Sequence, residues 1–198
     1  MASIEELRAG VRRSLPEVDL IQDEELRNRV VEAWAFALSR SEFTSIDEIR
    51  ASGNPNTPAM VGGTQSQHLR GVTRMALAIA DSLSGVVGPF GVDRDILIAC
   101  GLCHDVGKPF EFSPSNQERW KSNPAATGYP SVRHPAYGVY VALTVGLPEQ
   151  VVHACGAHSG EGEKVQRSLE TTIVHHADYA FWQILSRAGR LQEEWPEI

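Results

Sequence analysis

The sequence predicts an all-α protein. Apolar residues recur at helical spacing along most of the chain, helix-capping signatures precede several of these stretches, and no convincing pair of alternating strand patterns is found. A chain of 198 residues with 42% apolar and 22% charged residues suits one globular domain, or one domain with an appended segment. A chain of this length buries about 70% of the surface of its unfolded form, so one core can stabilise it.

The N-terminal segment, residues 1–60, is expected to form helices that pack on a central domain. Ser3 and Glu6 have the spacing of a capping box before an apolar stripe. Residues 23–40 place apolar side chains on one face of a second helix. Ser45 and Glu48 repeat the capping signature, which predicts a short helix before the breaker-rich loop at 53–63.

The central domain, residues 64–188, should be a set of helices joined by loops. A long helix is expected over 64–84, and Asp93 is placed to cap the apolar helix that follows. Residues 106–133 contain several Pro and Gly and little periodicity, which predicts a long loop. Helices are expected again over 135–145, 149–157 and 168–188, and a C-terminal tail over 189–198.

Composition disfavours two classes of function. Lys and Arg number 18 and Asp and Glu 25, a formal charge of −7, which argues against coating of DNA or RNA. Apolar runs such as residues 96–103 are far shorter than the ~20 residues that span a bilayer, and the N-terminus lacks the apolar stretch of a signal peptide.

Cys100 and Cys103 lie in an apolar helical run and are expected to face the core, with a redox or zinc role as the alternative. A cytoplasmic, reduced protein is the simplest interpretation, and the sequence leaves open whether it forms a homodimer.

The histidines and two aspartates carry the chemical signal. His104 and Asp105 are adjacent at the expected end of a helix, where neighbouring side chains can converge, and Gly107 is placed to end that helix. Imidazole and carboxylate suit zinc, iron, manganese and related ions, and helix bundles build such sites from facing helices. If one carboxylate bridges, two ions can be held by the candidate ligands His68, His104, Asp105, His134, His158 and Asp178.

The order of these six residues on successive helices resembles the HD-domain superfamily of metal-dependent phosphohydrolases. The segment LIACGLCHDVGK is similar to the signature helix of that superfamily, and IVHHADYAFWQ is similar to its closing helix. The resemblance covers residues 64–188 and implies an HD-domain helical bundle with an N-terminal helical extension. It maps the core metal ligands to His68, His104, Asp105 and Asp178, and the two extra histidines of binuclear members to His134 and His158.

The resemblance also implies a cofactor and a reaction. Two divalent ions are expected, with Fe or Mn preferred and Zn, Co, Ni and Mg compatible, bridged by Asp105. Hydroxide held by the ions would attack the phosphorus of a small-molecule phosphoester or phosphoanhydride, a nucleotide being one candidate. The pattern is especially similar to the diadenosine-polyphosphate hydrolases of the superfamily, although the N-terminal segment and the longer loop before His134 depart from them.

Five further residues are candidates for catalysis or substrate binding. Lys108, in the HD-x-G-K pattern, would act with Asp105 in catalysis and contact phosphate, or would be an ordinary exposed lysine at a helix end. Arg133 is a second candidate for anion binding. His175 shares the helix face of Asp178 and would orient the site or contact substrate. Trp120 and Phe110, in the expected loop at 106–133, would stack a ring of the substrate or pack into an aromatic cluster of their own.

Two other functions remain open from the sequence. Some members of the superfamily resemble inositol oxygenase, in which a diiron centre activates dioxygen, and the same ligands would serve an oxygenase, a lyase or a non-phosphate hydrolase acting on a small organic or aromatic compound. Iron content and an oxygen requirement would separate these activities. A regulatory module without catalysis is the third alternative, which the intact ligand set disfavours.

Overall fold

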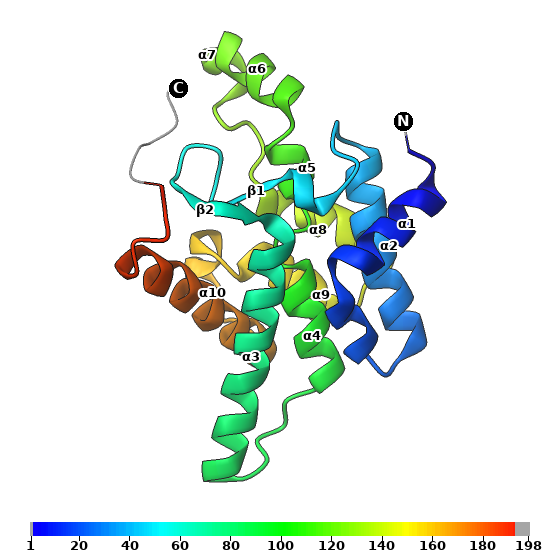
Figure 1. Cartoon of the computed structure of the whole chain (residues 1–198), viewed down its shortest axis with the longest axis vertical. Helices are drawn as coiled ribbons and strands as arrows, with labels where there is room; N and C mark the ends of the chain where they lie inside the picture. The colour runs from blue at the N-terminus through cyan, green and yellow to red at the C-terminus, as the bar shows by residue number, and fades with distance from the viewer. Residues whose placement is uncertain (1, 193–198) are drawn as a thin grey trace.

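The computed structural model describes residues 2–192, and it confirms the all-α class (Figure 1). The long helices start at capping residues that the sequence identifies: Ser3 and Glu6 form a complete capping box, and Asp93 and Ser168 accept hydrogen bonds from the first turns of their helices. The helices are α1 (Ile4–Ser14), α2 (Glu24–Ser39), α3 (Gln65–Val87), α4 (Arg94–Cys103), α5 (Lys108–Glu111), α6 (Pro114–Ser122), α7 (Pro124–Thr127), α8 (His134–Thr144), α9 (Glu149–Ala157) and α10 (Leu169–Arg187).

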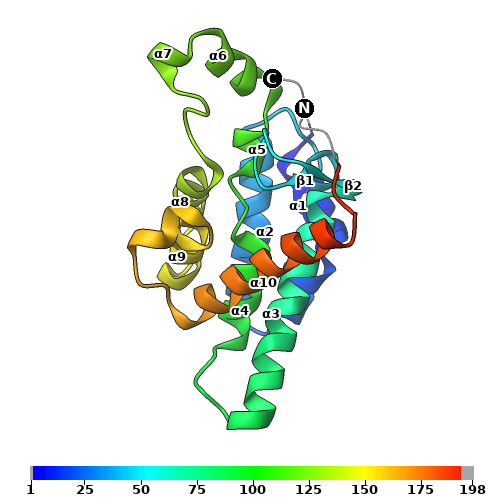
Figure 2. The ribbon, with the colours of Figure 1, turned by 90° about the vertical axis from the view of Figure 1, so that its left-hand side faces the viewer.

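Helix α4 is the centre of the bundle. All of its residues from Ile96 to Cys103 are buried, which explains why this segment reads as a continuous apolar run. Helices α3 and α10 pack along one side of α4, and α9, which is paired with α8, packs along another (Figures 1 and 2). The end of α4 therefore lies inside the bundle, where side chains from four other helices can reach it.

The N-terminal helices share their core with the bundle. Helices α1 and α2 pack on each other, and α2 packs on α4. The indole Nε1 of the buried Trp34 in α2 donates a hydrogen bond to the carbonyl oxygen of Leu102, at 2.8 Å. The buried Glu17, in the 3-10 helix η1 (Pro16–Leu20), accepts hydrogen bonds from Arg70 and Arg74 of α3. These contacts join the N-terminal segment to the two helices that carry the first candidate ligands.

Two predictions for residues 45–63 are wrong. Ser45 and Glu48 do form a capping box, but it starts a single 3-10 turn, η2 (Ile46–Glu48), and not a short helix. The chain then forms a hairpin in which β1 (Arg50–Ser52) pairs antiparallel with β2 (Ala59–Thr64). A strand of three residues is too short to show alternation, and Gly62 and Gly63 weaken the pattern in its partner, so neither strand has a recognisable sequence pattern.

Residues 190–192 lie along the same hairpin. The carbonyl oxygen of Arg190 accepts a hydrogen bond from Val61 N at 2.9 Å, and Gln192 N donates to the carbonyl oxygen of Ala59 at 2.9 Å. The first residues of the predicted tail therefore extend β2 on its free edge, next to the start of α3. Residues 193–198 of that tail lie outside the described part of the chain.

The prediction of a long loop over residues 106–133 is also wrong. Helices α5, α6 and α7 occupy most of this segment, and each has a proline in its first turn. Proline is well suited to that position because its missing N–H is not needed there, so residues that suggest breaks in a helix here start helices. Helices α6 and α7 extend away from the bundle at one end (Figure 2). Within residues 2–192, no helix combines the length and apolar character needed to cross a membrane.

Candidate metal centre

The fold brings all six candidate ligands into one buried cluster. His68 comes from the first turn of α3 and Asp178 from the middle of α10. His104 caps the C-terminus of α4 and Asp105 follows it, while His134 begins α8 and His158 caps the C-terminus of α9. None of the six is more than 7% exposed. The helix ends at His104 and His158 let the chain turn so that both rings face the same centre.

The carboxylate of Asp105 lies between two pairs of histidines. Its Oδ2 atom is 3.2 Å from Nε2 of His68 and 3.4 Å from Nε2 of His104. Its Oδ1 atom is 3.1 Å from Nε2 of His134 and 3.6 Å from Nε2 of His158. We call His68 and His104 the Oδ2 pair, and His134 and His158 the Oδ1 pair. A carboxylate with one oxygen toward each pair has the placement of a bridging ligand.

Three of the four imidazoles are held in the orientation that a metal ligand needs. Nδ1 of His104 contacts the carbonyl oxygen of Gly101 at 2.8 Å, and Nδ1 of His158 contacts the carbonyl oxygen of Ala154 at 3.0 Å. Nδ1 of His134 contacts Oε2 of Glu111 at 2.5 Å. Because these oxygens only accept, Nδ1 must carry the proton, and Nε2 presents its lone pair to the centre.

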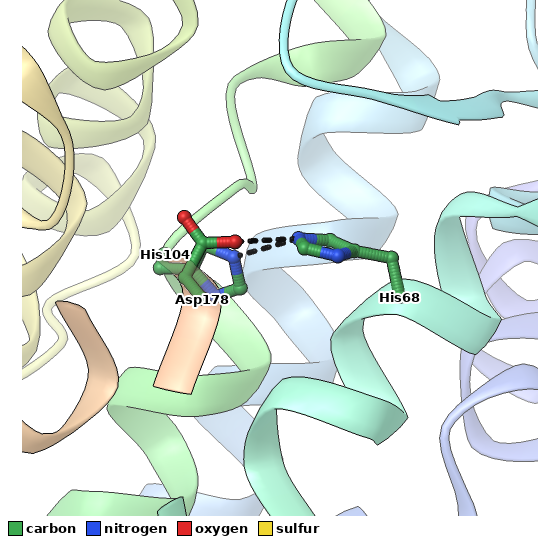
Figure 3. A group of neighbouring side chains, drawn as sticks. All are labelled: His68, His104 and Asp178. Carbon is green, nitrogen blue, oxygen red and sulfur yellow. Dashed lines mark hydrogen bonds and ion pairs between the residues drawn. The ribbon is translucent and has the colours of Figure 1, made fainter. Parts of the chain in front are cut away.

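Three atoms at the centre fit a bound cation better than they fit one another. Oδ1 of Asp178 is buried and has no hydrogen-bond partner among residues 2–192, although it lies 3.3 Å from Nε2 of His68. Nε2 of His68 in turn lies 3.2 Å from Nε2 of His104, and Figure 3 shows the three side chains converging from α3, α4 and α10. Buried acceptors without donors are costly, and a divalent ion among them would satisfy all three.

The donor atoms also cluster tightly enough to share an ion. Those of His68, His104 and Asp178 lie within 4.8 Å of one another, and so do those of His104, Asp105 and His158. Imidazole nitrogens and carboxylate oxygens without a thiolate suit Fe, Mn, Zn and related ions.

The pKa shifts at this cluster favour neutral rings at His68 and His134 and an ionised carboxylate at Asp105. Burial lowers the pKa values of His68 and His134, so their imidazoles are neutral. Burial alone would raise the pKa of Asp105, but the positive charge of Lys108 and the hydrogen-bonding contact with His104 outweigh it and hold that pKa well below its ordinary value. Burial likewise opposes charge on His104, yet the neighbouring Asp105 raises the pKa of its ring. The aspartate is therefore an anion that attracts cations.

Lys108 is buried beside this centre and is not an exposed lysine at a helix end. Its Nζ lies 2.8 Å from Oδ2 of Asp105, 2.5 Å from the carbonyl oxygen of Ser52 and 3.3 Å from Oε1 of Gln65. The three N–H donors of the ammonium thus have partners within the protein. Gln65 also donates from Nε2 to Oδ2 of Asp105 at 2.8 Å. Contact between Lys108 and a substrate stays a prediction.

Arg133 and His175 border the centre through its supporting residues. Arg133 pairs with Glu111 at 2.6 Å and with Glu161 at 2.9 Å, so its guanidinium already has two anionic partners. Nδ1 of His175 contacts the carbonyl oxygen of His158 at 2.6 Å. His175 therefore contacts the backbone of the candidate ligand His158, which agrees with the predicted orienting role. The predicted contacts of both residues with substrate stay predictions.

Phe110 and Trp120 lie together in an aromatic cluster. Their ring centroids are 5.9 Å apart, and the ring of Phe110 stacks on Tyr137 of α8 at 4.0 Å. Trp120 is buried. Of the two alternatives for these residues, the packing agrees with an aromatic cluster of their own, and their contact with a substrate ring stays a prediction.

Glu111 and Gln65 are the residues of this region that the sequence analysis missed. Both are buried, and both contact candidate ligands that lie far from them along the chain. A glutamate at the end of a four-residue helix and a glutamine at a helix start have no distinctive pattern. Their only sequence signal is indirect, because each lies within three residues of another residue at the site.

Comparison with known proteins agrees with the metal-binding cluster that the geometry indicates. A family model described as HD domain matches residues 66–180. The chain is 28% identical over 185 residues to dihydroneopterin 2',3'-cyclic phosphate phosphodiesterase from Methanocaldococcus jannaschii, an alignment that covers 91% of this chain and 72% of that protein. No solved structure matches the chain.

Proposed function

This chain belongs to the HD-domain family of metal-dependent phosphohydrolases, and we propose that it hydrolyses a phosphoester or phosphoanhydride bond of a small molecule. The observation that carries the proposal is the position of Asp105 between the Oδ1 and Oδ2 pairs. Such a cluster suits two divalent ions, and a phosphate group could then be neutralised without a basic protein surface.

The residues would divide the work between two ions. His68, His104 and Asp178 would hold one ion, His134 and His158 the other, and Asp105 would contact both. Divalent ions held there would lower the pKa of a bound water and neutralise charge on the phosphoryl group. Fe and Mn remain the favoured metals. The protein would contribute the fixed orientation of the imidazoles, and Lys108 would hold Asp105 in its ionised form.

The relative suggests a narrower substrate class. Its name describes a phosphodiesterase of dihydroneopterin 2',3'-cyclic phosphate. We extend this to the present chain as a cyclic phosphodiester of a nucleotide-like small molecule. The scissile bond of such a compound is a phosphoester, which fits hydrolysis at paired cations.

A substrate panel tests the proposal. The purified protein, supplied with Mn²⁺ or Fe²⁺, would be incubated with 2',3'-cyclic nucleotides, dinucleoside polyphosphates and phosphomonoesters. We expect hydrolysis of at least one class, lowered about 100-fold or more in His104→Ala, because metal catalysis is worth several kcal/mol. His176→Ala is the matched control, because His176 is exposed. Dioxygen consumption with an organic substrate, and no hydrolysis across the panel, would refute the proposal in favour of an oxygenase.

A further inference from the structure

Glu111 is a buried carboxylate beside the centre that the metal cluster itself does not include. It ends the short helix α5, and its exposed fraction is 0%. A carboxylate in such a place is costly unless each oxygen has donors. Both of its oxygens have them, and they come from two consecutive residues, Arg133 and His134.

One oxygen of Glu111 holds His134 at two points. Oε2 accepts a hydrogen bond from the backbone N–H of His134 at 2.9 Å and lies 2.5 Å from Nδ1 of its imidazole. The first contact fixes the start of α8, and the second fixes the rotation of the ring. Together they leave Nε2 directed at Oδ1 of Asp105, 3.1 Å away.

The other oxygen joins Glu111 to the neighbourhood of His158. Oε1 pairs with Arg133 at 2.6 Å, and Arg133 pairs with Glu161 at 2.9 Å. Glu161 lies in the 3-10 helix η3 (Gly160–Lys164), which follows His158. The contacts from Glu111 through Arg133 to Glu161 therefore join the start of α8 at His134 to the segment that follows His158.

We propose that Glu111 is a positioning residue for the second metal ion, the one assigned to His134 and His158. Its carboxylate keeps the proton of His134 on Nδ1 and the Nε2 lone pair toward the cluster, and Arg133 keeps the carboxylate itself in place. This inference rests on the proposed function, because it assumes two ions. It adds that occupancy of one of them depends on a residue that touches neither ion nor substrate.

The expected size of the effect follows from similar arrangements. Loss of a carboxylate that accepts the second N–H of a metal-binding histidine weakens metal affinity by about 10- to 100-fold. The ion at His68, His104 and Asp178 should be unaffected, because none of these residues contacts Glu111 among the hydrogen bonds found within residues 2–192. Selective weakening of one ion is a result that a general loss of packing would not produce.

The experiment is a Mn²⁺ titration of metal-free full-length protein, followed by equilibrium dialysis and elemental analysis. The variants are Glu111→Ala, which removes the carboxylate, and Glu111→Gln, which keeps the shape and one accepting oxygen but loses the charge. Glu118→Ala is the matched control, because Glu118 is exposed on the neighbouring helix α6. If the alanine variant fails to fold, the glutamine variant still provides the test.

We expect two ions per wild-type chain. Glu111→Ala should bind the second ion about 10- to 100-fold more weakly and the first as the wild type does, Glu111→Gln should show a smaller loss, and Glu118→Ala none. Two results would overturn this inference and leave the proposed function intact. One is wild-type affinity for both ions in the two Glu111 variants, and the other is equal weakening of both ions. A wild-type protein that binds no ion would overturn both.

Discussion

Replacing Gly107 by alanine should disturb the candidate site purely through lack of space. Gly107 follows Asp105 by two residues, and its φ of −81° and ψ of −8° are open to any L-amino acid. A Cβ at this position would lie 2.1 Å from the carbonyl oxygen of His134 and 2.7 Å from the backbone nitrogen of Gly138. Both atoms belong to the main chain of α8, so no rotation of a side chain can relieve the contact.

The required displacement sets the size of the effect. Ordinary contact begins at 3.4 Å, so α8 must move away from the turn by more than an ångström. Asp105 is fixed to the turn and His134 to α8, so the gap opens between two atoms that now lie 3.1 Å apart. Overpacking of this kind costs about 1–3 kcal/mol, which a domain with a typical stability of about 5–15 kcal/mol survives. Misplacement of a reacting group by ~1 Å can cost about 100-fold in rate.

The assay compares kcat, Mn²⁺ stoichiometry and the urea midpoint of Gly107→Ala with those of the wild type. We expect a folded protein with one ion fewer and kcat lowered about 100-fold. Gly85→Ala is the control, because Gly85 is exposed in α3 and a Cβ there meets nothing within 4 Å. That variant should be as active as the wild type and up to about 1 kcal/mol more stable. Wild-type metal content and kcat in Gly107→Ala would show that the turn and α8 are not rigidly packed, and would refute the reasoning.

Three further predictions concern stability. Trp34→Phe removes the donor to the buried carbonyl oxygen of Leu102 and should lower the free energy of unfolding in urea by about 1–3 kcal/mol; an unchanged midpoint would contradict this. Burial alone would raise the pKa of Asp47, but hydrogen bonds from the surrounding hydroxyl groups lower it from 3.8. The carboxylate of Asp47 therefore stabilises the fold above pH 3.8, and this contribution is lost as the pH falls through the lowered pKa. The difference in unfolding free energy between wild type and Asp47→Asn should therefore be constant at neutral pH and shrink below about pH 4, and a pH-independent difference would be evidence against it. Mn²⁺ at about 100 times its Kd should stabilise the wild type by about 2.7 kcal/mol for each bound ion in thermal unfolding; EDTA should abolish the shift, and His104→Ala should reduce it.

The helices were predictable because their signals are local. The capping box at Ser3 and Glu6 and the cap at Asp93 act within three residues, and the structure contains each of them. The order of the six candidate ligands was readable for a related reason, since each stands at a helix start, a helix end or an inward position of a helix. Their convergence depends on how the helices pack, so it was predictable only from the resemblance to a family.

The parts that were missed depend on contacts between distant residues. Strand β1 is stable because β2 pairs with it; β1 is too short to show alternation, and Gly62 and Gly63 interrupt the pattern of β2. In the segment 106–133, Pro114 and Pro124 begin helices, whereas composition alone suggested a loop. Glu111 is recognisable only once α5 and α8 are placed side by side, because 23 residues separate it from His134.

The pairing of the positively charged residues at the centre leads to a prediction about how the protein binds an anionic substrate, separate from its hydrolysis. Lys108 is the cation nearest to Asp105, and its donors are used by Asp105, Ser52 and Gln65. Arg133 is paired with two carboxylates. An anionic substrate that had to displace these partners would strand a buried carboxylate, which is costly.

The positive charge that attracts a phosphate should therefore come from the divalent ions. We expect calorimetric titration with a non-hydrolysable phosphorothioate analogue of the best substrate to show binding to the Mn²⁺-loaded protein, and at least about 100-fold weaker binding after dialysis against EDTA, because metal coordination of phosphate oxygens supplies several kcal/mol. Lys108→Met should have little effect on binding to the metal-loaded protein if it folds. Strong binding that survives EDTA and is lost in Lys108→Met would show instead that the lysine exchanges Asp105 for the substrate, and that the buried ion pair opens during the catalytic cycle.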